Sequence, residues 1–138
     1  MVFLTRRERF SAAHRLYNPA LSDAENEKVY GACSNPNWHG HNYVLWVTVK
    51  GEVNPETGYV ADLKQLSQII REVIIDRLDH RNINLEVAFM AGKMVSTENL
   101  VIAIWEELEP HMKAIGVYLH CIKLEETENN SIEYYGKS

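Results

Sequence analysis

Residues 39–53 read HGHNYVLWVTVKGEV and form a long run of strand-forming side chains. Successive side chains of a strand point to opposite faces, so the run separates into two sets by parity. One face is expected to carry His39, His41, Tyr43, Leu45, Val47 and Val49, and the other Asn42, Val44, Trp46 and Thr48. A lone sheet with apolar side chains on both faces would expose much apolar surface, so we expect several copies of the chain to associate.

The preceding residues predict a second strand that pairs with the first. Val2–Ala13 is rich in strand formers, has its apolar side chains on one parity and ends at His14. The capping-box pair Ser22 and Glu25 predicts a short helix between the two strands, reaching about Tyr30.

Two long helices and a hairpin are predicted after residue 53. Asp62 is a plausible N-cap for a helix over Leu63–Leu78, with an apolar stripe of Leu63, Leu66, Ile70, Val73 and Ile74. A second helix begins at Ser96 and carries Leu100, Ile104, Leu108 and Met112, and Pro110 is expected to bend or end it. His120–Glu126 and Ser131–Tyr135 then form a hairpin. The order ββααββ predicts an α+β fold: a four-stranded antiparallel sheet with two helices on one face.

Length and composition fit one domain over residues 1–138 that acts on a small molecule. Hydrophobic residues make up 46% of the chain, and 14 basic against 19 acidic side chains give a net charge of −5. Without a basic cluster, a nucleic-acid or anionic-membrane surface is not expected. The start MVFLTRRERF lacks an apolar signal region, and two cysteines do not make a disulfide scaffold. We therefore expect a cytoplasmic protein.

His39 and His41 are the strongest local signal, because residues i and i+2 of a strand share a face and can reach one metal ion. His14 ends the neighbouring strand where His39 begins the next, so it is the natural third ligand. Three neutral imidazoles with an open fourth position are typical of catalytic zinc. The alternative is a pair of surface histidines that happen to alternate.

Cys33 lies six residues before His39, in the spacing C-x5-H-x-H. Its thiol could be a general base, a nucleophile or a fourth zinc ligand, and the last would make a closed structural site. Cys121, in a strand-like run, is expected to be an apolar core residue.

Asp79 and His80 are adjacent, so the carboxylate could orient the imidazole, although such pairs also occur at ordinary helix ends. Residues 125–128 form an acidic run, and most runs of this kind are exposed to solvent. One buried carboxylate there could nevertheless bind the amidine-like edge of a ring through paired hydrogen bonds.

Four segments together resemble the 6-pyruvoyl-tetrahydropterin synthase family, in the same order and over nearly the whole chain. They are FSAAH at 10–14, GACSNPNWHGHNY at 31–43, LDHRN at 78–82 and STEN at 96–99. The resemblance implies the tunnelling fold, in which trimers close their sheets into a barrel and two trimers form a homohexamer. It also implies a lyase reaction that converts 7,8-dihydroneopterin triphosphate to 6-pyruvoyl-tetrahydropterin and releases triphosphate, in tetrahydrobiopterin biosynthesis.

The same resemblance implies a role for each candidate residue. It makes His14, His39 and His41 the ligands of one Zn²⁺ per subunit, Cys33 the base, and Asp79 and His80 the proton relay of an adjacent subunit. Glu126 becomes the pterin anchor, with Thr97 and Glu98 in the neighbouring pterin-contacting segment. If the register slips by one residue, Glu125 and Glu126 exchange their roles.

Several alternatives stay open at this level. The 6-carboxytetrahydropterin synthases share the fold, but usually keep the cysteine closer to the histidine pair, and an aldolase reaction on the same substrate is a further candidate. A non-catalytic zinc module would leave Asp79, His80 and Glu126 without a role. No phosphate-binding glycine loop is present, so scattered basic side chains are expected at the triphosphate, with Arg15 as a candidate. Whether Mg²⁺ also binds the triphosphate is left open by the sequence.

Overall fold

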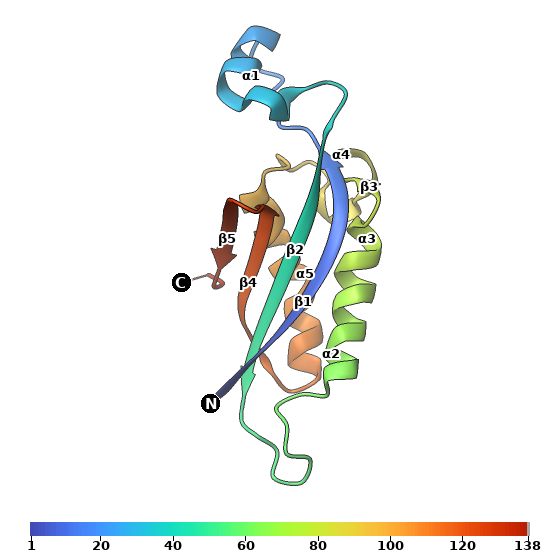
Figure 1. Ribbon diagram of the computed structural model, residues 1–138, viewed down its shortest axis with the longest axis vertical. Coiled ribbons are helices and arrows are strands. Elements are labelled where there is room, and N and C mark those ends of the chain that lie inside the picture. Colours follow the sequence, from blue (N-terminus) through green and yellow to red (C-terminus); the bar gives the residue numbers. More distant parts are fainter. Residues whose placement is uncertain (138) are drawn as a thin grey trace.

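Five strands form one sheet in the order β3-β1-β2-β4-β5, in a computed structural model that describes residues 1–137. The bounds are β1 (Val2–His14), β2 (His39–Gly51), β3 (Arg81–Asn82), β4 (Tyr118–Thr127) and β5 (Asn130–Tyr134). The sheet follows the long axis of the molecule, and β1 and β2 are its longest strands (Figure 1). The pairs β1–β2, β2–β4 and β4–β5 are antiparallel, as predicted.

The prediction of four strands and a purely antiparallel sheet is wrong at one edge. β3 pairs parallel to β1 through Ala12 with Arg81 and Ala13 with Asn82. A strand of two residues has no readable alternation, so the sequence pattern could not reveal it.

The helices are α1 (Asp23–Tyr30), α2 (Leu63–Ile70), α3 (Asp76–Leu78), α4 (Ile83–Glu86) and α5 (Thr97–Ala114). A π-helical segment, Arg71–Ile75, joins α2 to α3, so the predicted helix over residues 63–78 is continuous but carries a bulge. α1 begins with the predicted capping box of Ser22 and Glu25, and it projects beyond the shared end of β1 and β2 (Figure 1).

Pro110 lies inside α5, which continues to Ala114, so of the two expected effects of the proline the structure excludes an end of the helix. The last turn is retained because Leu108 and Met112, on either side of the proline, are fully buried. Burial of each such side chain is worth about 1.5–3 kcal/mol, comparable with the cost of proline in a helix interior.

The core lies between one face of the sheet and the helices. It contains Phe10, Tyr43, Leu45, Val47 and Val49 from the strands, with Leu66, Ile70, Ile74, Leu100, Ile104 and Leu108 from the helices. These sets follow the predicted parity and helical spacing, except that Leu63 is 53% exposed. No helix of the described residues is long and apolar enough to cross a membrane.

The other face of the sheet is partly covered by long basic side chains. The guanidinium of Arg7 and the ammonium of Lys123 lie 5.7 and 5.0 Å from the centre of the Trp46 ring. Exposed apolar side chains gather instead at one end of the sheet, at Val2, Phe3 and Tyr118. The prediction that copies associate therefore depends on this end and on the free strand edges.

Trp38, in the loop before β2, has a φ of 71°, and its N–H donates to the Asn35 carbonyl at 3.0 Å. In this left-handed region a Cβ atom costs about 1–2 kcal/mol. We expect Trp38→Gly to unfold with a free energy about 1 kcal/mol higher than Trp38→Ala, because both lose the indole but only alanine keeps the Cβ. Urea denaturation measures the difference. Ala32→Gly, at a position without positive φ, is the control and should lower stability; equal stability of the two Trp38 variants would contradict the strain.

Candidate metal centre and active site

The ladder between β1 and β2 gathers three imidazoles on the helix-covered face of the sheet. His14 lies opposite His39, and Ala12 lies opposite His41. The ring centres of His14 and His41 are 5.1 Å apart, those of His39 and His41 4.3 Å, and those of His14 and His39 6.2 Å. The expected cluster of histidines therefore forms within one chain.

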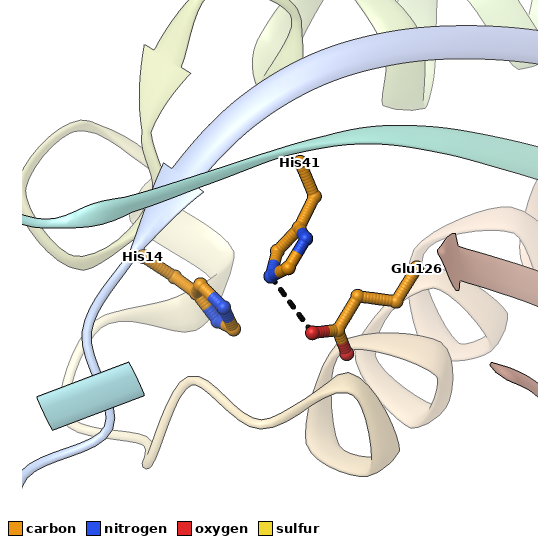
Figure 2. A group of neighbouring side chains, drawn as sticks. All are labelled: His14, His41 and Glu126. Atoms are coloured by element: carbon orange, nitrogen blue, oxygen red, sulfur yellow. Dashed lines mark ion pairs between the residues drawn. The ribbon is translucent and has the colours of Figure 1, made fainter. Parts of the chain in front are cut away.

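The tightest group of ligand atoms differs from the predicted set at one position. His14, His41 and Glu126 offer one ligand atom each within 4.8 Å of one another, so Glu126 stands where His39 was expected (Figure 2). The closest contact joins His41 Nε2 to Glu126 Oε1, at 2.8 Å. Cys33 lies outside this group, which disfavours a closed site of one cysteine and three histidines.

The protonation of these side chains suits a cation. His14 Nδ1 lies 2.9 Å from the Val95 carbonyl and donates to it, so Nε2 is the ring nitrogen that faces the site. This Nε2 is buried and has no hydrogen-bond partner among the described residues. Burial, together with neighbouring His39 and His14, lowers the pKa of His41 against the opposing charge of Glu126. Neutral imidazoles and a carboxylate are the form that binds a divalent metal.

Glu126 reaches the site because β4 pairs with β2 in a register that puts neighbouring acidic residues on opposite faces. Glu125 lies opposite Val44, on the face away from the helices, whereas Glu126 contacts His41. The Thr97 hydroxyl, at the start of α5, donates to Glu126 Oε2. The register therefore selects Glu126 over Glu125. Glu98, one residue beyond Thr97, is exposed and is not brought into the site.

Cys33 lies in a 3₁₀ turn, Gly31–Ser34, that the residues after His14 hold in place. The Leu16 N–H donates to the Cys33 carbonyl at 2.7 Å, and Arg15 Nε donates to the Ser34 carbonyl at 2.9 Å. Burial first, and then the negative charge of Glu126, raise the pKa of the Cys33 thiol. The Arg15 guanidinium also stacks on Tyr17, 4.1 Å from the centre of its ring. Arg15, the candidate triphosphate contact, is therefore already bound to the Cys33 turn through Ser34.

Asp79 and His80 lie at the other edge of β1, where β3 begins. The Ser11 N–H donates to Asp79 Oδ1 at 2.9 Å, and this bond is the main reason that the pKa of Asp79 is lowered. Its second oxygen lies 3.1 Å from His80 Nδ1, so an ionised Asp79 orients the imidazole. His80 has a φ of 58°, and its side chain is 85% exposed. A strained, exposed and oriented imidazole suits a reacting group better than a packing residue.

A groove of about 750 Å³ connects these regions. Its lining includes Asp79, His80 and Glu126, but not Cys33. The lining also includes side chains on the face of the sheet away from the helices, which are Arg7, Arg9, Asn42, Val44 and Glu125. Within one chain, the structure thus brings the Asp79–His80 pair to the same groove as the pterin-anchor candidate, and places the cysteine outside it.

Two residues of the site were missed by the sequence analysis. Val95 fixes the tautomer of His14 through its backbone carbonyl, which no side-chain pattern reveals. Tyr43, assigned to the strand core, has a buried hydroxyl without a partner among the described residues. The only sequence signal for Tyr43 is its parity with His39 and His41.

A model of the family described as 6-pyruvoyl tetrahydropterin synthase matches residues 3–137. The chain belongs to this family. A relative from Dictyostelium discoideum, named 6-pyruvoyl tetrahydrobiopterin synthase, is 46% identical over 99% of this chain and 97% of its own length. The Homo sapiens protein of the same name is 45% identical over 97% of this chain and 91% of its own length. A solved 6-pyruvoyl tetrahydropterin synthase from Caenorhabditis elegans superposes with a TM-score of 0.88 and 40% identity, over 99% of this chain and 96% of that one. The α+β fold of the single chain expected from the resemblance is confirmed.

The charge of Glu126 raises the pKa of Cys33, so removal of this charge should lower the pKa of Cys33. We expect Glu126→Gln to shift the pH dependence of Cys33 alkylation by iodoacetamide to lower pH in the metal-free protein, while burial keeps the pKa above the ordinary value. Glu125→Gln is the matched control, since this carboxylate faces away, and it should leave the profile in place. An unchanged profile for Glu126→Gln would contradict the proximity of the two side chains.

Proposed function

We propose that this member of the 6-pyruvoyl tetrahydropterin synthase family converts 7,8-dihydroneopterin triphosphate to 6-pyruvoyl-tetrahydropterin, with elimination of triphosphate. The observation that carries the proposal is the group of His14, His41 and Glu126, in which the buried Nε2 of His14 has no hydrogen-bond partner among the described residues, in a chain that matches the family over residues 3–137. As one domain over residues 1–138, the protein would act in the cytoplasm in tetrahydrobiopterin biosynthesis.

His14, His39 and His41 are proposed to hold one Zn²⁺ ion, since their rings already lie together and His14 presents a free Nε2. When His41 is a ligand, its Nε2 is no longer available to Glu126. The carboxylate of Glu126, still hydrogen-bonded to Thr97, can then accept two N–H groups from the amidine-like edge of a pterin. This accounts for Glu126 lying beside the histidines without being a permanent ligand.

Cys33 is proposed as the base that removes a proton from a side-chain carbon of the substrate. Its pKa is raised in the chain alone, so the thiol is a poor base without added positive charge. A bound Zn²⁺ supplies that charge and, as a Lewis acid, polarises the side-chain oxygens of the substrate. Arg15 and Leu16 hold the Cys33 turn, so they fix the position of the thiol relative to His14.

Asp79 and His80 are proposed to return protons as the triphosphate leaves. Asp79 stays ionised and orients His80, whose other ring nitrogen is then free to exchange a proton. Because Cys33 does not line the groove that contains His80, we propose that the pair serves the Cys33 of an adjacent subunit in a homohexamer. The 85% exposure of His80 in one chain and the exposed apolar end of the sheet support this assembly.

The test is incubation of the purified protein with 7,8-dihydroneopterin triphosphate, followed by identification of the products by mass spectrometry. We expect 6-pyruvoyl-tetrahydropterin and free triphosphate, and loss of both after zinc chelation. A 6-carboxy product or an aldol cleavage product would instead assign one of the related pterin reactions.

Replacement of the cysteine separates a base from a metal ligand. Cys33→Ala should abolish turnover yet retain about one zinc per chain, because three histidines suffice to bind the ion. Zinc content is measured by atomic absorption, with Cys121→Ala as the control for loss of a buried thiol. A Cys33→Ala protein that lost its zinc would show that the thiol is a ligand.

Complementation tests whether sites are shared between subunits. Cys33→Ala and His80→Ala should each be inactive, but their random mixture should recover about a quarter of wild-type activity, since half of the chains supply a good cysteine and half a good histidine. Co-expression followed by native mass spectrometry measures activity and mixing together. Mixed oligomers without activity would show that each site lies within one chain.

A further inference from the structure

Tyr43 is a buried side chain with an unused polar group at the proposed active site. The residue is 1% exposed, and its hydroxyl has no hydrogen-bond partner among the described residues. Its ring stacks on Phe10 at 4.8 Å, and it meets the His41 ring edge-on at 5.6 Å. His14 Nε2 is likewise buried without a partner among residues 1–137, whereas His41 Nε2 lies 2.8 Å from Glu126 Oε1.

Packing alone does not explain a tyrosine at this position. A buried hydroxyl without a partner costs about 1–3 kcal/mol, and phenylalanine would stack on Phe10 equally well without that cost. An acceptor that enters the site with another molecule would offset the cost. The hydroxyl is thus suited to a ligand rather than to the folded chain.

The Tyr43 hydroxyl is available as a hydrogen-bond donor. A phenolic hydroxyl keeps its proton near neutral pH, and this one has no acceptor among the described residues. The His14 and His41 rings flank Tyr43, with their centres 6.5 and 5.6 Å from the centre of its ring. The unpartnered donor therefore lies beside two of the proposed metal ligands.

We propose that the Tyr43 hydroxyl is a further catalytic group, which donates a hydrogen bond to the substrate side-chain oxygen where negative charge develops as Cys33 removes the neighbouring proton. Tyr43 keeps its own proton throughout; the electron pair of the broken C–H bond moves toward that oxygen, and the proton goes to the Cys33 sulfur. A fixed donor at such an oxygen is worth far more in the transition state than in the ground state. The inference rests on the proposed function and adds a residue to it.

The test uses Tyr43→Phe, which removes only the hydroxyl, with Tyr134→Phe as control. Tyr134 is on β5, packs against Trp105 and lies away from the histidines. We expect Tyr43→Phe to lower kcat by about 10²-fold, with unchanged zinc content and a Tm that is equal or higher. A lower Tm with unchanged kcat would assign Tyr43 a structural role and overturn the inference.

A second measurement locates the hydrogen bond. Affinity for 7,8-dihydroneopterin triphosphate is measured by calorimetry in Cys33→Ala, where turnover is absent, with and without Tyr43→Phe. We expect about fivefold weaker binding without the hydroxyl. A lowered kcat with unchanged affinity would confine the hydrogen bond to the transition state, in support of the proposal. Weaker binding with unchanged kcat would make the hydroxyl a substrate-binding group only and would overturn the catalytic role.

The outcomes also separate this inference from the function on which it rests. A wild-type protein that neither binds nor converts the substrate would overturn both. An active wild-type protein with an equally active Tyr43→Phe variant would overturn the inference alone.

Discussion

The unbroken antiparallel register between β1 and β2 is the constraint on which the site depends. Thirteen residue pairs run without a bulge from Val2 opposite Gly51 to His14 opposite His39. A slip of one residue would turn His14 to the opposite face from His39 and His41, and would move Phe10 out of the core. The apolar side chains of the same strands therefore fix the positions of the metal ligands, because the register that buries Phe10 against Tyr43 also brings the imidazoles together.

The site concentrates features that a folded chain would otherwise avoid. The Nε2 atom of His14 and the Tyr43 hydroxyl are buried without hydrogen-bond partners among the described residues, and Trp38 and His80 have left-handed backbones. Such groups reduce the stability of the isolated chain, and a metal ion and a substrate would satisfy them on binding. The raised pKa of Cys33 follows the same logic, since burial and the Glu126 charge disfavour the thiolate and a nearby cation would favour it.

The sequence predicted those parts of the molecule that depend on local periodicity. Alternation along residues 39–53 placed His39 and His41 on one face, and helical spacing identified the buried stripe of α5. Two features could not be predicted from the sequence. β3 is too short to show alternation, and the π-helical segment at Arg71–Ile75 leaves the apolar pattern of the helix intact. The contact of Glu126 with His41 depends on how β4 pairs with β2, including a shift at Thr48 and Val49, which no local pattern encodes. The role of Glu126 came instead from the family resemblance.

The central claim is an open metal site of imidazoles, with the Cys33 thiol left free to act on substrate. X-ray absorption spectroscopy of the zinc-loaded protein tests it most directly. The account predicts only nitrogen and oxygen scatterers at about 2.0–2.1 Å, with the outer-shell pattern of imidazole and no sulfur. A zinc–sulfur distance of about 2.3 Å would contradict it, because the cysteine would then be a ligand and the site would be closed to substrate.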